Sequence, residues 1–301
     1  MRGCRISLYA LALALALAVS AAGCGRGRGA PKSEVGKVMV VASIAPLGYF
    51  ARRVGGDRVE VEMLVPPGSS PHTFEPKPEQ LRALSKAKVL VLNGVGLELW
   101  ADDLIGAARN PDLKVVKTAD GLDILRASGH GQEQFGNPHV WLDPIDAIRQ
   151  VEKIRDALIE ADPAGADTYH GNADSLVADL RKLDAEIKAA VATFRSKDFV
   201  SQHAAWAYFA RRYGLVEAAV VETTPGREPS PGEIADIVQT VKKAGARAVF
   251  AEPQLSQKAA QVIAAETGAK VLLVNPLGIP PDYDYLETMR YNLAELKKGL
   301  G

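Results

Sequence analysis

The stretch DFVSQHAAWAYFARRYGLVEAAVVE (residues 198–222) holds the pattern from which the fold can be predicted. A short run at 198–202 predicts a strand, the amphipathic segment at 204–213 predicts a helix, and the run at 216–222 predicts a second strand. This strand–helix–strand order is typical of a parallel sheet flanked by helices.

The same alternation extends over the rest of the chain from Val38 onward. Further strands are expected over 38–43, 59–64, 88–93, 113–117, 246–252 and 270–275, and further helices over 46–55, 78–86, 231–244, 256–267 and 285–299. We therefore expect an α/β protein with two lobes, each containing a parallel-type sheet flanked by helices.

A long helical stretch separates the two halves. Asp162 and Pro163 are typical of an N-cap followed by proline at the first helical position. One apolar stripe with helical spacing follows, made by Leu176, Leu180, Leu183, Ile187 and Phe194. The pattern predicts a rigid linking helix over 162–195, between an N-terminal lobe at 37–161 and a C-terminal lobe at 196–301.

The first residues are typical of an exported protein. Residues 1–23 resemble a signal peptide, because basic residues precede a 14-residue apolar run that is shorter than the roughly 20 residues of a membrane span. Small residues directly before Cys24 resemble a bacterial lipobox, and 24–36 then form a flexible tether. The alternative is ordinary cleavage, which would leave Cys24 as a free thiol. We expect a membrane-anchored lipoprotein on the extracytoplasmic face, either at the cell surface or in a periplasm.

Composition excludes several classes of function. Lys+Arg and Asp+Glu both number 36, so there is no basic excess for a nucleic-acid partner. The only cysteines are Cys4 and Cys24, which leaves none in the body for a disulfide, a thiolate metal site or a catalytic thiol. The sequence also lacks the phosphate-loop, H-E-x-x-H, G-x-S-x-G and G-x-G-x-x-G motifs.

Three histidines follow the carboxyl ends of predicted strands. His72 lies in PPGSSPHTFEPKP (66–78), His139 lies in NPHVWLDP (137–144) before a helix capped by Asp143, and His203 follows the strand at 198–202. Ligands of open α/β sheets bind beyond these strand ends. Any one of these histidines could also be an ordinary solvated or packed residue. Together they predict a site in the cleft between the lobes, whereas His130 and His170 are expected at the surface.

The segments around the three histidines resemble the zinc/manganese solute-binding proteins of bacterial ABC importers. The segment EPSPGEIADIVQTVKKAGARAVFAEPQLSQKAAQVIAAETGAKV (228–271) and the segment DYLETMRYNL (284–293) are also similar to that family. The resemblance covers residues 38–299 and implies two α/β lobes joined by one long helix. It implies a metal between the lobes, bound by His72, His139 and His203.

The family usually adds an aspartate as the fourth ligand, and this chain has Asn275 at that position. Asparagine can offer a carbonyl oxygen but brings no charge. The fourth position is therefore open to Asn275, to water, or to a carboxylate such as Asp282 or Asp284. Glu252 is expected to contact a metal-binding residue without contacting the metal itself.

The ligand set favours zinc as the transported ion. Imidazole suits tetrahedral Zn²⁺, whereas Mn²⁺ prefers oxygen-rich sites. The resemblance implies a monomeric binding protein that delivers Zn(II) to a membrane permease powered by a separate ATPase subunit. The alternatives are a Mn(II)-specific binding protein, a metal-dependent adhesin of the same fold and, more remotely, a three-histidine zinc hydrolase. An enzyme is not expected, because no motif supplies a general base.

Overall fold

The computed structural model describes residues 36–126, 135–224 and 226–301. Residues Lys37–Gly301 form one compact unit. The predicted signal peptide, Cys24, nearly all of the predicted tether and His130 lie outside the described residues. In the part of the chain that is described, no helix combines the length and the apolar character needed to cross a membrane.

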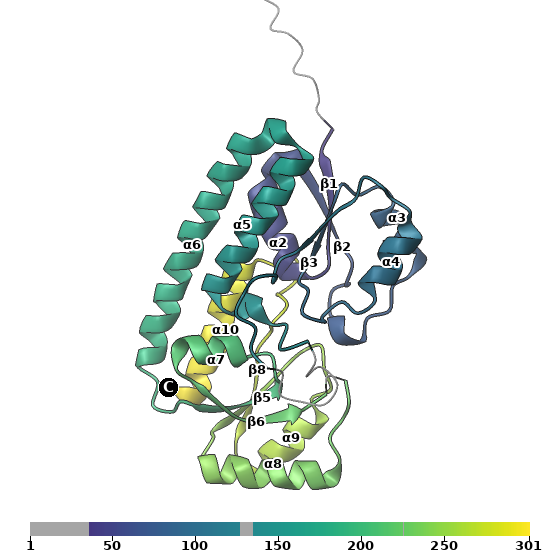
Figure 1. The fold of residues 1–301 in the computed structure, drawn as a ribbon. Coiled ribbons are helices and arrows are strands. Elements are labelled where there is room, and N and C mark those ends of the chain that lie inside the picture. Colours follow the sequence, from purple (N-terminus) through teal and green to yellow (C-terminus); the bar gives the residue numbers. More distant parts are fainter. Residues whose placement is uncertain (1–35, 127–134, 225) are drawn as a thin grey trace, which may run out of the picture. The chain divides into compact units, whose positions relative to one another are not determined.

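The N-terminal lobe is built on a four-stranded parallel sheet (Figure 1). Its strands are β1 (Val38–Ala42), β2 (Val59–Met63), β3 (Val89–Leu92) and β4 (Lys114–Lys117), in the order β2-β1-β3-β4. Its helices are α2 (Ala45–Gly55), α3 (Pro78–Leu84), α4 (Ala101–Ala108) and α5 (Pro144–Ala161). All four residues of β3 are buried, as expected for a central strand with helices on both faces.

The C-terminal lobe repeats this topology with a second parallel sheet. The strands β5 (Asp198–His203), β6 (Val216–Glu222), β7 (Ala248–Ala251) and β8 (Lys270–Leu273) lie in the order β6-β5-β7-β8. The helices are α7 (Ala207–Tyr213), α8 (Pro231–Ala244), α9 (Lys258–Thr267) and α10 (Tyr285–Leu300). The predicted two-lobed α/β fold is confirmed. Apart from the linking helix, the strands and helices that were given bounds above agree with the structure within three residues at each end.

The two halves are connected by α6 (Ala166–Ala192), which has 27 residues and a length of about 40 Å (Figure 1). It contacts α2 and α5 of the N-terminal lobe as well as α7 and α10 of the C-terminal lobe. The predicted apolar stripe faces the core, since Leu176, Leu180, Leu183 and Ile187 are fully buried.

The predicted start of this helix at Asp162 is wrong. A 3-10 turn (Pro163–Gly165) precedes α6, and the Asp162 carboxylate makes no cap. It instead accepts hydrogen bonds from Arg58 (2.8 and 3.0 Å) and from the Tyr169 hydroxyl (2.7 Å). Both carboxylate oxygens thus have side-chain partners, and these partners prevail over the local cap signal.

One apolar core extends across both lobes. Its members include Phe50 and Trp141 from the N-terminal half and Phe199 and Phe209 from the C-terminal half. Tyr285, at the start of α10, packs edge-on against Phe50 with ring centroids 4.9 Å apart. The last helix therefore packs against residues of both lobes.

Candidate metal site

His203 is the last residue of β5 and is buried. Its Nδ1 lies 2.7 Å from Oε1 of Glu252, which directly follows β7 and is also buried. A carboxylate can only accept, so the proton of the neutral imidazole is on Nδ1 and the lone pair is on Nε2. Glu252 thus contacts the side of the His203 ring opposite to Nε2.

His139 is buried just before a 3-10 turn (Val140–Leu142) and α5. Oδ1 of Asn137 accepts from the backbone amide of His139 (3.0 Å), so this atom is the amide oxygen. The same oxygen lies 2.8 Å from Nδ1 of His139, which must therefore donate. The lone pair of His139 is again on Nε2. As predicted, Asp143 caps the following helix by accepting from the amide of Ile145 (2.8 Å).

His72 lies on a 3-10 turn (Pro71–Thr73) in the proline-rich loop after β2. The hydroxyl of Ser70 accepts from its backbone amide (3.3 Å), and proline fixes the preceding backbone dihedral. The turn holds the imidazole against the other two histidines, with the His72 and His139 ring centroids 5.2 Å apart.

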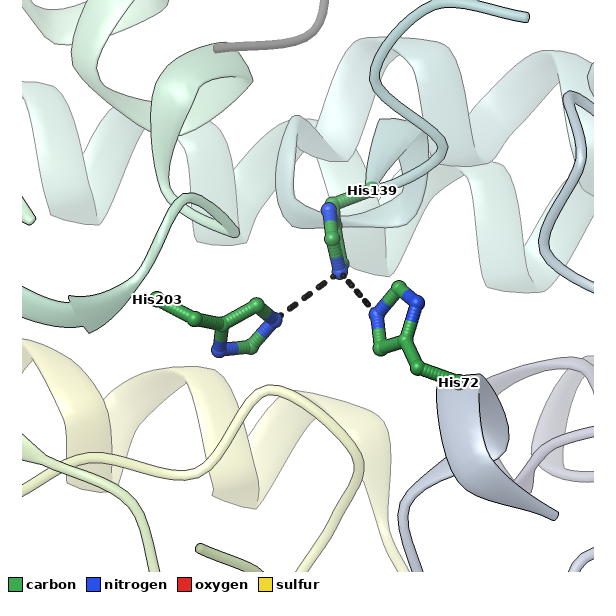
Figure 2. Close-up of side chains that lie close together, drawn as sticks. All are labelled: His72, His139 and His203. Atoms are coloured by element: carbon green, nitrogen blue, oxygen red, sulfur yellow. Dashed lines mark hydrogen bonds between the residues drawn. The ribbon is translucent and has the colours of Figure 1, made fainter. Parts of the chain in front are cut away.

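The three imidazoles converge with His139 in the middle (Figure 2). Nε2 of His139 lies 3.2 Å from Nε2 of His72 and 3.1 Å from Nε2 of His203. Tetrahedral Zn²⁺ with Zn–N bonds of 2.0–2.1 Å spaces its nitrogen ligands about 3.3–3.4 Å apart. Within the described residues, these histidines form the one group of three or more His, Cys, Asp or Glu placed to hold a metal ion.

The cavity beside these histidines has a volume of about 10 Å³. This is close to the roughly 10–15 Å³ that one water-sized particle needs. The space therefore suits a single ion and not an organic ligand.

Burial keeps two of the imidazoles neutral. It lowers the pKa of His72 to about 3 and that of His139 well below its usual value, and nearby histidine charge adds to both effects. Burial also acts to lower the pKa of His203, but the charge and hydrogen bond of Glu252 and the charges of Glu217 and Glu222 together outweigh it, and the pKa is raised. A cation in the cavity would face two neutral nitrogen ligands and a third backed by a buried carboxylate.

The other predicted candidates lie apart from the histidine cavity. Asn275 is in the loop after β8, and its Oδ1 accepts from the amides of Leu277 (2.9 Å) and Gly278 (3.1 Å). Asp284 caps α10, and Asp282 is exposed. None of these three predicted candidates is among the described residues that line the cavity. His170 is exposed on α6, as expected.

The family of this chain follows from a match to a family model. Residues 40–299 match the model of the family described as zinc-uptake complex component A, periplasmic. The chain belongs to this family.

Individual zinc-uptake relatives agree with this assignment. The zinc-binding protein AdcA of Streptococcus pyogenes serotype M6 is 32% identical over 287 residues, which cover 87% of this chain and 56% of AdcA. The chain thus spans about half the length of the curated relatives it matches. The crystal structure of ZnuA matches with a TM-score of 0.81 and 35% identity, covering 88% of this chain and 99% of that one.

A third similar protein is the laminin-binding protein Lmb of Streptococcus agalactiae, described as bifunctional with adhesin and metal transporting activity. Its structure matches with a TM-score of 0.78 and 32% identity, covering 88% of this chain and all of that one. The zinc-uptake fold in this chain is therefore shared with proteins of more than one described role.

Two residues at the histidine site were missed by sequence reasoning. Asn137 holds the His139 ring, and its place two residues before His139 in the NPH motif was the available signal. Gln254 lines the histidine cavity and directly follows Glu252-Pro253 in FAEPQ. Neither residue type is itself a signal of metal binding, which is why the pattern did not single them out.

Proposed function

We propose that the protein captures Zn²⁺ outside the cytoplasm through His72, His139 and His203 and delivers it to an ABC importer. The observation that carries this proposal is the convergence of three Nε2 atoms, from three separate segments, on a cavity sized for one ion. Glu252 and Asn137 support it, because each directs an Nε2 lone pair inward.

Zinc is the proposed cargo because nitrogen dominates the donor set. Imidazole ligands suit Zn²⁺, whereas Mn²⁺ favours carboxylate and carbonyl oxygens. The carboxylate nearest to the histidines, Glu252, is hydrogen-bonded to the outer nitrogen of His203. Its charge therefore acts on the ion through the imidazole.

Transport is proposed over zinc hydrolysis because, among the described residues, no carboxylate stands free beside the histidines to act as a general base. Glu252 is hydrogen-bonded to the outer nitrogen of His203. We further propose a monomer of two lobes, 37–161 and 196–301, joined by the linking helix and anchored through lipidated Cys24. Its partner would be a permease with a separate ATPase subunit.

Competitive titration of the chelator-stripped protein from residue 26 onward with Zn²⁺ and Mn²⁺ tests the proposal. One-to-one binding with strong preference for zinc is expected. His203→Ala should weaken zinc binding by at least 100-fold, because it removes one of three nitrogen ligands. The matched control is His170→Ala, since His170 is exposed on α6. Preference for manganese, or equal effects of the two variants, would contradict the proposed site.

A further inference from the structure

Gln254 lines three cavities. One is the small histidine cavity, one is a cavity of about 20 Å³ beside Leu277, and one is an outer cavity of about 560 Å³ that shares Ser70 and Leu255 with the histidine cavity. Oε1 of Gln254 is buried, and across residues 36–126, 135–224 and 226–301 it has no hydrogen-bond partner. A buried carbonyl oxygen without a donor is unfavourable, so such an atom in a native protein needs an explanation.

The orientation of this amide is fixed by its neighbour, Asn275. Oδ1 of Asn275 accepts from the backbone amides of Leu277 and Gly278, and its Nδ2 donates to the carbonyl of Gly278 (2.7 Å). The atom of Asn275 that faces Gln254 is therefore an oxygen. Gln254 must present its Nε2–H to this oxygen, at 2.7 Å, and Oε1 is the atom left without a donor.

Oxygens of the Ser70 and Glu252 side chains and of the Pro276 backbone, which also line the histidine cavity, accept hydrogen bonds. The Ser70 hydroxyl accepts from the amide of His72, and Oε1 of Glu252 accepts from His203. The carbonyl of Pro276 accepts from the indole of Trp141 (2.7 Å). Gln254 Oε1 is the side-chain oxygen in this lining that is buried and lacks a partner within the described residues.

We propose that Oε1 of Gln254 is the fourth donor to the bound ion and that Asn275 positions it. This inference rests on the proposed zinc-binding function. Zinc reaches four-coordination with nitrogen and oxygen ligands, and an amide oxygen completes three imidazoles without adding charge. Asn275 would then act through its hydrogen bond to Gln254 and not through direct contact with the ion.

The test compares four variants of the chelator-stripped full chain by zinc competition titration. Gln254→Met keeps the side-chain length but removes the oxygen, and zinc affinity should fall roughly tenfold or more. Gln261→Met, at an exposed position on α9, is the matched control and should bind zinc like the unmodified chain. Asn275→Ala should weaken binding too. The double variant should be no weaker than Gln254→Met, because coupled residues are not additive.

A crystal structure of the zinc-loaded protein gives a second, independent measurement. Gln254 Oε1 is expected about 2.0–2.2 Å from the ion. The inference is overturned if Asn275 or water occupies that position, or if Gln254→Met binds zinc like the control. In those cases the proposed function still stands. It fails separately if the unmodified chain does not bind zinc or if His203→Ala binds it normally.

Discussion

At the scale of single residues, two histidines of the site are held by different kinds of acceptor. Glu252 places a buried negative charge behind His203, whereas Asn137 offers His139 only a neutral carbonyl oxygen. The two imidazoles differ accordingly, because the pKa of His203 is raised and that of His139 is lowered. The carboxylate makes His203 the more basic of these two imidazoles.

Replacing Glu252 with glutamine separates charge from hydrogen bonding. Glu252→Gln can still accept from His203 Nδ1 but removes the charge that strengthens this ligand. We expect zinc affinity to fall by about 10–100-fold in a competition titration at neutral pH. Glu228→Gln, at an exposed carboxylate lining the outer cavity, is the control for a general loss of negative charge. Similar losses of zinc affinity in the two variants would mean that Glu252 acts only through the total negative charge of the protein.

At the scale of elements, β6 carries a carboxyl group, that of Glu217, whose ionised form is disfavoured by burial. β6 is an edge strand of its sheet, and Glu217 accepts a hydrogen bond from the Ser201 hydroxyl of β5 (2.5 Å). Burial raises the pKa of Glu217 from 4.5 to about 7, although the Ser201 hydrogen bond and the His203 charge oppose it. The strand therefore tolerates a protonated Glu217 better than an ionised one.

Neutralising this residue should change how stability depends on pH. A raised folded-state pKa means that the contribution of Glu217 is fully present below about pH 4.5 and is lost as pH rises through about 7. Glu217→Gln should therefore change the free energy of unfolding of the metal-free protein more favourably at pH 8 than at pH 4.5. The difference between the two pH values should be on the order of 1–3 kcal/mol. Urea unfolding at both pH values measures this difference. Glu60→Gln, at an exposed position of β2, is the control, and an equal response there would refute the assignment.

At the scale of the whole folded unit, the residues around the histidines also connect the two lobes. Nδ2 of Asn137 donates to the carbonyl of Ala204, directly after His203 (2.7 Å). The Tyr208 hydroxyl on α7 donates to the carbonyl of Asn137 (2.7 Å). The Tyr285 hydroxyl on α10 donates to the carbonyl of Trp141 (2.6 Å). Ligand geometry and lobe contact therefore depend on the same hydrogen bonds.

Asn137→Ala should weaken both zinc binding and the contact between the lobes. It frees the His139 ring and removes the bond to Ala204, so we expect zinc affinity to fall by about 10–100-fold and the free energy of unfolding to fall by about 1–3 kcal/mol. Asn172→Ala is the matched control, because Asn172 on α6 donates to the carbonyl of Val54 (3.0 Å), away from the site.

The two measurements for this comparison are urea unfolding of the metal-free chains and zinc competition titration. Both variants lose a hydrogen bond and some stability, but only Asn137→Ala should lose zinc affinity. Faster amide hydrogen exchange near residues 137–140 and 204–206 should accompany that loss. Equal zinc affinities would show that Asn137 contributes to stability alone.

Features that depend on local pattern could be predicted from the amino-acid sequence. Strand–helix alternation predicted both parallel sheets, and the apolar stripe on α6 predicted its buried face. The motifs around His72, His139 and His203 predicted which side chains meet, although these residues are 64 and 67 positions apart. Periodicity and motif order are local properties, so they can be recognised without coordinates.

Only the tertiary structure decided which partner each polar group takes. Asp162 has the sequence of a helix cap, but Arg58, 104 residues earlier, occupies its carboxylate. Asn275 stands at the position of the family's aspartate, yet its oxygen is bound to backbone amides and to Gln254. Such choices depend on distant segments that fold to within hydrogen-bond distance of one another. A buried polar group must use whichever partner folding brings to it.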